Sequence, residues 1–125
     1  MDNVKYDFEK CESAYTTPYV LITSKDKRKK FGRIRAYTKV GKEHYAVKFG
    51  VEGKKPIYLS CLFVEEKYRN QGIARGLVQT VKTKFKNKTI FLHARRDCES
   101  FGLFSTEGFT IIEQDEEWVL MRLIN

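Results

Sequence analysis

Residues 68–76 constrain the fold of this chain more than any other part of its sequence. They follow an apolar run at residues 57–64 and open a helical pattern, which predicts a strand, a short loop and a helix N-terminus in succession. Such a junction presents unpaired backbone N–H groups and the positive end of a helix dipole to an anion. Because Gly72 lets a ligand approach the main chain closely, the segment predicts a phosphate-binding loop.

Two other phosphate-binding patterns are absent from the sequence. A nucleoside-triphosphate P-loop ends in Gly-Lys-Ser/Thr, a dinucleotide fingerprint needs Gly-x-Gly-x-x-Gly, and the chain has neither. The alternative interpretation of residues 68–76 is a plain strand-to-helix turn in which Gly72 serves only the backbone.

The composition predicts a single globular domain over residues 1–125. The chain is 42% hydrophobic and 14% aromatic, which excludes a disordered polypeptide. The cysteines, Cys11, Cys61 and Cys98, are odd in number and lack metal-ligand spacing, so we expect neither a disulfide framework nor a metal site. No apolar run approaches the length of a membrane span, and we expect a cytoplasmic, reducing location.

The positive charge is concentrated in one part of the chain. The formal net charge is +8, and residues 25–55 hold 12 basic and 3 acidic residues. The run at residues 25–30, with Arg33 and Arg35 beyond it, is suited to contact nucleic acid or a negative protein surface. A solvated loop is the alternative for this run.

The hydrophobic periodicity predicts an α/β protein with a mixed sheet. A helix at residues 71–87 joins two apolar strands, which should therefore be parallel. A second, short helix should be capped by Asp97 and ended by a left-handed Gly108. The start of the chain leaves room for one short helix at most, between residues 7 and 15, followed by a break at residues 16–18. The expected strands are residues 19–23, 31–40, 44–49, 57–64, 89–94, 109–113 and 117–124, with turns at 51–56 and 114–116.

The spacing Arg-x-x-Gly-x-Ala from Arg69 to Ala74 resembles the acyl-CoA pyrophosphate loop of the GCN5-related N-acetyltransferase (GNAT) superfamily. The later part of the predicted element order is the order which that superfamily shows, and Gly108-Phe109 stands in register with a second family motif. The resemblance implies the GNAT fold, with antiparallel strands, a crossover helix, a central parallel pair and a C-terminal hairpin. It also implies transfer of an acetyl group from acetyl-CoA to a primary amine, such as a protein lysine, a protein N-terminus or a polyamine.

The resemblance also assigns residues to the cofactor. The strand backbone near Leu62 should pair with the pantetheine arm, and the loop amides should hold the pyrophosphate. Arg69, Arg75 or Lys82 would add positive charge, and Asp97 stands where the family often has an asparagine. The full set of implied cofactor residues is Leu62, Phe63, Val64, Arg69, Asn70, Gln71, Gly72, Ile73, Ala74, Arg75 and Asp97.

The acid and base of the reaction are harder to assign from the sequence. Tyr58 takes the strand position where histone-type members carry a glutamate base, and the tyrosine that protonates the leaving thiolate in many members is replaced by Phe104. Ser105 is the nearest hydroxyl, and Cys98 offers a thiol. Tyr58 and Ser105 are therefore the candidate catalytic residues. Ordinary structural roles for these side chains, with proton transfer through water, are the alternative.

Three functions stay open at this point. The first is an N-acetyltransferase. Because the start of the chain leaves room for one short helix at most, the acceptor side of its site should be open, which favours a macromolecular amine or a wall of the site supplied by a second subunit in a homodimer. An acidic cluster, Glu113, Asp115, Glu116 and Glu117, would attract a cationic amine to it. The second is a non-catalytic acyl-CoA-binding module, and the third is a small basic nucleic-acid-binding domain.

Overall fold

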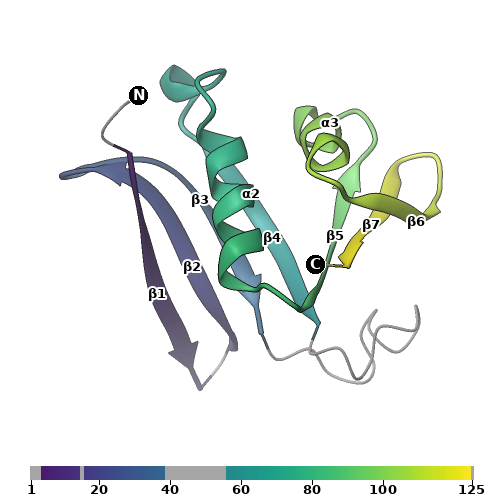
Figure 1. Cartoon of the computed structure of the whole chain (residues 1–125), viewed down its shortest axis with the longest axis horizontal. Coiled ribbons are helices and arrows are strands. Elements are labelled where there is room, and N and C mark those ends of the chain that lie inside the picture. Colours follow the sequence, from purple (N-terminus) through teal and green to yellow (C-terminus); the bar gives the residue numbers. More distant parts are fainter. Residues whose placement is uncertain (1–3, 15, 39–55, 125) are drawn as a thin grey trace.

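The computed structural model describes residues 4–14, 16–38 and 56–124 of the chain, and all structural statements refer to these ranges. The described parts contain seven strands and two α-helices, whose arrangement can be followed in Figure 1. A short 3₁₀ turn, η1 (Glu66–Tyr68), precedes the first of these helices. The elements are β1 (Lys5–Ser13), β2 (Thr16–Asp26), β3 (Lys29–Tyr37), β4 (Ile57–Val64), α2 (Ile73–Lys84), β5 (Thr89–Arg95), α3 (Glu99–Thr106), β6 (Thr110–Gln114) and β7 (Trp118–Ile124).

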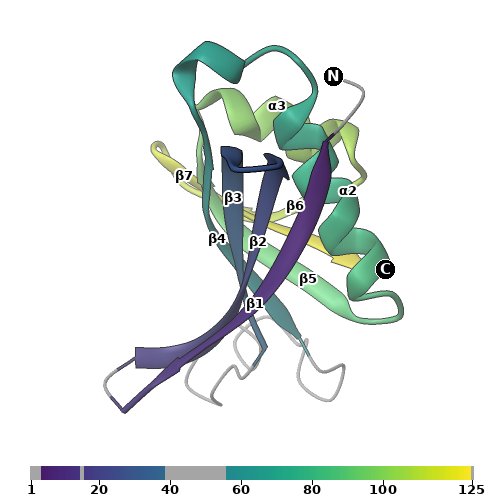
Figure 2. The ribbon, with the colours of Figure 1, turned by 90° about the vertical axis from the view of Figure 1, so that its left-hand side faces the viewer.

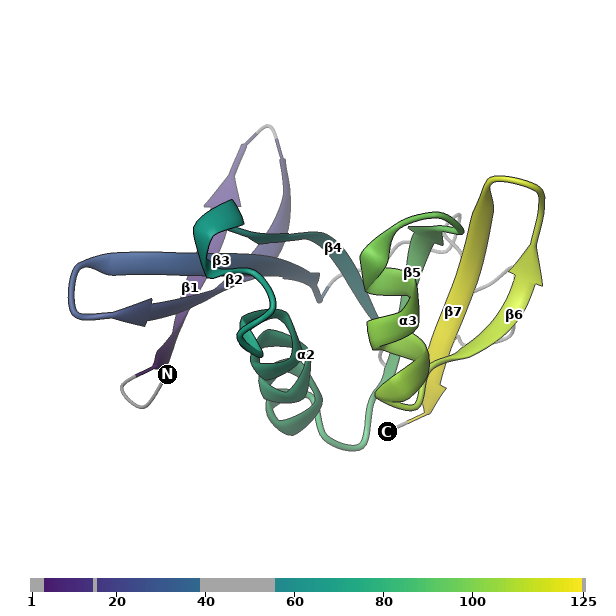
Figure 3. The ribbon, with the colours of Figure 1, turned by 90° about the horizontal axis from the view of Figure 1, so that it is seen from above.

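The strands form one mixed sheet in the order β1-β2-β3-β4-β5-β7-β6. β4 and β5 are parallel, as predicted, and every other neighbouring pair is antiparallel. α2 is the crossover between the parallel strands, and α2 and α3 lie on the same side of the sheet (Figure 3). The mixed α/β architecture predicted from the periodicity is therefore confirmed.

The two parallel strands part soon after they meet. β4 and β5 are paired only from Ile57 to Leu59, opposite Ile90 to Leu92, and beyond Leu59 the two strands diverge (Figure 3). A bulge in β4 lies at the parting, where the β3–β4 register shifts and Cys61 has a positive φ of 58°. A bulge bends its strand and increases its twist, so it directs the end of β4 away from β5.

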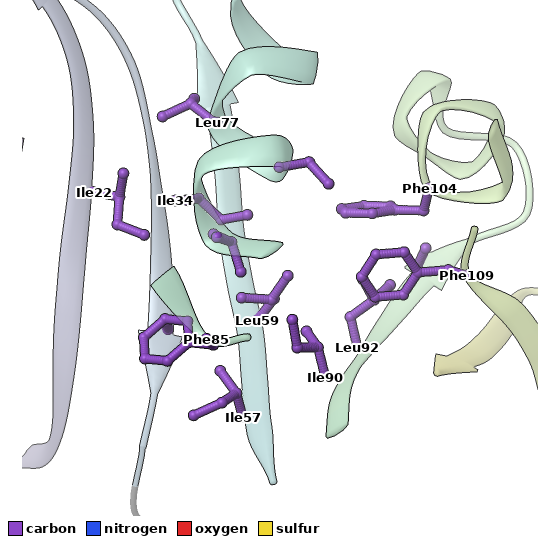
Figure 4. Close-up of a cluster of buried hydrophobic side chains, with 14 of the residues drawn as sticks. Ile22, Ile34, Ile57, Leu59, Leu77, Phe85, Ile90, Leu92, Phe104 and Phe109 are labelled. Atoms are coloured by element: carbon purple, nitrogen blue, oxygen red, sulfur yellow. The ribbon is translucent and has the colours of Figure 1, made fainter. Parts of the chain in front are cut away.

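The main core lies between the sheet and α2. The inner face of this helix carries Ile73, Leu77, Val78 and Val81, all of which are buried. Figure 4 shows Leu77 and Phe85 in one cluster of buried side chains with the strand residues Ile34 and Leu59. Burial of each such side chain contributes about 1.5–3 kcal/mol relative to exposure. This packing fixes the start of α2 against the end of β4.

The C-terminus of α3 is closed as the sequence predicts. Gly108 has a φ of 98°, its N–H bonds to the Ser105 carbonyl, and the Phe109 N–H bonds to the Phe104 carbonyl. These two bonds form a Schellman motif, which satisfies carbonyls at the end of the helix. The Phe104 and Phe109 rings pack edge to face, with centroids 5.4 Å apart (Figure 4). Phe104 is thereby held in the core.

The N-terminal expectation was wrong. Residues 5–13 form β1 rather than a short helix, and the expected break at residues 16–18 lies inside β2. Pairing with β2 decides the conformation of β1, because tertiary contacts override weak local preferences. Pro18 is accommodated where the β1–β2 register shifts between Cys11 and Ser13. Figure 2 shows β1 along the edge of the sheet beside α2. The Tyr6 hydroxyl of β1 lies close to Gly76 of α2.

Other differences are local. β3 ends at Tyr37 rather than at residue 40. The expected strand at 44–49, and all but the last residue of the expected turn at 51–56, lie outside the described residues. Asp97 does not cap α3, because Cys98 is the N-cap residue and makes no side-chain capping bond. The Asp97 carboxylate is instead 3.5 Å from Arg95 Nε and is 80% exposed. No helix in the described part of the chain is long and apolar enough to cross a membrane.

Candidate active site

A groove of about 580 Å³ runs along the end of β4 and the start of α2. Nine of its lining residues are among the cofactor contacts expected from the sequence, and α3 supplies its opposite wall. From β4 and the loop it is lined by Leu62, Phe63, Val64, Tyr68, Arg69, Asn70, Gly72, Ile73, Ala74 and Arg75, and from α3 by Glu99, Ser100 and Leu103. Gln71 and Asp97 are not among the lining residues.

The backbone of the loop is shaped to receive an anion. Gly72 is the N-cap of α2 with a φ of 82°, and Asn70 also has a positive φ, of 63°. The first intrahelical bond runs from the Gly76 N–H to the Gly72 carbonyl at 2.9 Å, so the amides before Gly76 have no partner within the helix. A Cβ added at Gly72 would meet no atom within 4 Å. The loop therefore leaves open space beside free amides, which fits the diphosphate of coenzyme A.

The nearby cations are not equivalent. Arg69 Nε donates a hydrogen bond to the Val64 carbonyl at 2.9 Å, and Arg75 Nε is 3.6 Å from the Glu107 carboxylate. Both arginines line the groove. Lys82 donates to the Glu107 carbonyl at 2.8 Å and does not line the groove. Of these three cations, Arg69 and Arg75 are therefore the two that line the groove.

A second cavity, of about 190 Å³, lies where β4 and β5 part. It shares Leu62 and Ser100 with the groove, so the two spaces adjoin. We call this cavity the crevice. Its lining residues are Ile34, Leu59, Ser60, Cys61, Leu62, Leu92, His93, Ala94, Arg95, Cys98, Ser100, Phe104 and Trp118.

His93 is a functional candidate that the sequence analysis missed. It lies on β5, is half-buried, and lines the crevice. Its ring stands edge-on to Tyr58 of β4, with centroids 6.3 Å apart. The sequence offered one signal for it, a histidine that interrupts an otherwise apolar strand. The structure thus brings one of the two predicted catalytic residues, Tyr58, beside an imidazole.

The other acid and base candidates, Ser105 and Cys98, lie in different places relative to the crevice. Ser105 is exposed on α3 and lines neither space, so the fold does not bring it to the crevice. Cys98 does line the crevice, with its Sγ 3.2 Å from the Ser100 Oγ. Phe104, at the family's tyrosine position, also reaches the crevice from the core.

The acidic residues of the last hairpin are partly engaged in the turn itself. The Asp115 carboxylate accepts hydrogen bonds from the Glu117 and Trp118 N–H groups, each at 2.8 Å. These two backbone bonds lower the pKa of Asp115, that of Trp118 most strongly. Asp115 therefore has a structural role in the turn between β6 and β7.

A model of the Acetyltransferase (GNAT) domain matches residues 46–120 of the sequence. The chain belongs to the GNAT acetyltransferase family. The protein is thus an acetyl-CoA-dependent acetyltransferase, and the membership of the GNAT superfamily predicted from the sequence is confirmed. A search of the curated proteins found no match.

Several solved GNAT structures share the fold. NAA60 of Arabidopsis thaliana with a bisubstrate analogue has 18% identity over 86% of this chain and 76% of its own, with a TM-score of 0.71. A GNAT acetyltransferase of Elizabethkingia anophelis with acetyl-CoA bound has 16% identity over all of both chains, with a TM-score of 0.72. The ribosomal-protein-S18-alanine N-acetyltransferase of Escherichia coli has 17% identity over 84% of this chain and 68% of its own, with a TM-score of 0.64.

Proposed function

We propose that this GNAT protein transfers an acetyl group from acetyl-CoA to a primary amine by direct attack within a ternary complex. The observation that carries the proposal is that the groove and the crevice adjoin and are lined by residues of different chemistry. The groove offers free amides and two arginines for a diphosphate, and the crevice is lined by the His93 imidazole, which contacts the Tyr58 ring. One space suits the anionic carrier, and the other suits a group that must lose a proton.

The end of β4 is suited to hold the thioester arm. From Ser60 onward β4 has no paired residue on β5, so the strand edge facing the crevice is open to a ligand. A backbone N–H near Leu62, directed at the thioester carbonyl, would stabilise the charge that develops on its oxygen. Holding the thioester and the amine in adjoining spaces supplies a further part of the rate.

His93, with Tyr58, is our candidate for the group that accepts the amine proton. An alkylammonium must lose a proton before it attacks, and imidazole is the side chain suited to accept one near neutral pH. The nitrogen–carbon bond then forms, the carbon–sulfur bond breaks, and the thiolate leaves. Phe104 has no hydroxyl to protonate the thiolate, so water or the Cys98 thiol would supply that proton.

The acceptor side of the site is unusually open. β1 ends at Ser13 and β2 begins at Thr16, so a short hairpin takes the place where GNAT proteins usually have two helices that wall the acceptor site. An open side favours an acceptor whose amine projects from a larger molecule, or a wall supplied by a second copy of the chain.

The experiment that tests this function measures binding and turnover on one preparation. Thermal unfolding is followed with and without acetyl-CoA, and thiol release is then measured against lysine peptides, peptides with free N-termini, and polyamines. Stabilisation together with thiol release is the expected result, since a ligand that binds only the folded state raises its stability. Stabilisation without release from any acceptor would instead point to the acyl-CoA-binding module that Phe104 makes the second candidate.

A further inference from the structure

Two arginines of β3 lie on the side of the sheet away from the helices. Arg33 and Arg35 alternate with Ile34 and Ala36, which are buried in the core under α2. Successive side chains of a strand point to opposite faces, so both arginines face the other side. Arg35 is paired in register with Ser60, a crevice residue, and Arg33 with Phe63. Arg35 is therefore paired with a residue that lines the crevice, and Arg33 with a residue that lines the adjoining groove.

The contacts of these arginines hold them in place without neutralising them. The Arg35 guanidinium lies over the Tyr19 ring, with its Cζ 4.6 Å from the centroid, and the Arg33 guanidinium lies over Phe63 at 5.1 Å. A hydrogen bond to Tyr37 is the main cause of a raised pKa at Arg35, so this group stays charged. Arg35 Nε is buried, and no atom in the described ranges accepts a hydrogen bond from it.

Several other cations of the protein, in contrast, have acidic partners. Within the described residues Lys25 pairs with Asp7, Arg75 and Lys82 pair with Glu107, and Arg95 pairs with Asp97. Among the same residues, no carboxylate is within 4 Å of Arg33 or Arg35. A buried donor left without a partner costs about 1–3 kcal/mol. The planar fork of a guanidinium matches a carboxylate through two parallel hydrogen bonds. The pair is thus arranged to receive an anion from outside.

We propose that the acceptor is a primary amine that carries a carboxylate near it, with the carboxylate bound by Arg35 and Arg33 and the amine beside Tyr58 and His93. This inference rests on the function proposed above. Neighbouring strands are about 4.8 Å apart, so the two groups of the acceptor should be separated by roughly one to two strand spacings. An acidic amino acid has this chemistry, and so does a peptide N-terminus followed by Asp or Glu. A polyamine or a lysine-rich tail would meet repulsion at Arg33 and Arg35.

The test compares acceptors that differ only in charge. Thiol release is measured with peptides that begin Ala-Asp, Ala-Asn and Ala-Lys, and with free aspartate and glutamate, at saturating acetyl-CoA. We expect kcat/KM to be at least tenfold higher for Ala-Asp than for Ala-Asn, with Ala-Lys the poorest. Activity with the free amino acids would identify a small-molecule acceptor, and activity with the peptides alone would identify a protein N-terminus. Both results support the proposal.

Variants tie this preference to the arginines. Arg35→Gln and Arg33→Gln should each reduce the Ala-Asp to Ala-Asn ratio toward one, while stabilisation by acetyl-CoA persists. Arg35→Lys keeps the charge but not the fork, and should retain an intermediate ratio. Arg28→Gln removes the same charge from the exposed β2–β3 turn and should leave the ratio unchanged.

Because the readout is a ratio, a general loss of stability in a variant does not imitate the effect. Equal turnover of acidic and amide peptides, unchanged by Arg35→Gln, would overturn the acceptor proposal and leave the acetyltransferase in place. Absence of thiol release from every acceptor tried, polyamines and lysine peptides included, would overturn the proposed function and this inference with it.

Discussion

Tyr58 and His93 face each other across the line where β4 and β5 part, with ring centroids 6.3 Å apart. They are 35 positions apart in sequence, and the parallel pairing of Ile57–Leu59 with Ile90–Leu92 brings them together. The pairing then ends, and the crevice opens beside it, with His93 among its lining residues. The same short stretch of sheet therefore aligns the rings and opens the space beside them.

Replacement of His93 should remove proton transfer and spare cofactor binding. We expect His93→Gln to lower kcat by about 10²-fold or more, the usual contribution of a general base. Stabilisation by acetyl-CoA should be unchanged, because His93 lines the crevice and not the groove. Steady-state thiol release and thermal unfolding measure the two effects separately. Tyr58→Phe, and the double variant, would show by non-additivity whether the two residues act as a unit.

A side chain at Gly72 should weaken acetyl-CoA binding. In Gly72→Ala the new Cβ enters the open space beside the loop amides, and we expect KM for acetyl-CoA to rise by about tenfold or more. The positive φ itself should cost about 1–2 kcal/mol of stability. Gly108→Ala is the matched control, because Gly108 also has a positive φ but lies at the end of α3, outside the groove. Equal rises of KM in both variants would count against a phosphate cradle at Gly72.

The close approach of β3 to β4 should depend on Gly32. A Cβ at this position would lie 2.6 Å from the Phe63 carbonyl oxygen, so Gly32→Ala must push the strands apart. We expect a loss of about 1–3 kcal/mol in the free energy of unfolding, measured by denaturant titration. Gly102→Ala is the contrasting change, because its Cβ meets no atom within 4 Å and it lies within α3. That variant should gain about 0.5–1 kcal/mol.

The stability contributed by Asp115 should depend on pH in the acid range. Its folded-state pKa is lowered by the N–H groups of Trp118 and Glu117, so the ionised form stabilises the fold above the ordinary pKa of 3.8. This contribution is lost as the pH falls through the lowered value. We expect Asp115→Ala to be less stable than the wild type at pH 7 and to match it near the acid limit. Asp115→Asn, which keeps an acceptor oxygen, should fall between them at pH 7.

The sequence alone determined the local features of this protein. A strand, a loop with Gly72 and the start of a helix follow one another along the chain, and so do the last turn of α3 and Gly108. Each of these features depends on the periodicity of hydrophobic residues and on the conformational freedom of glycine, and both are properties of only a few consecutive residues. The strand–loop–helix junction at Gly72, the parallel pair and the family could therefore be predicted.

Only the tertiary structure decided the features that join distant segments. β1 is a strand because β2 pairs with it, and His93 became a candidate because β5 carries it to Tyr58. Arg35 became a candidate because the sheet places it beside Tyr19 and Ser60 on neighbouring strands, and no pattern around it in the sequence indicated this. Such contacts depend on which strands pair and where they part, and these follow from the packing of the whole sheet against α2 rather than from local preference.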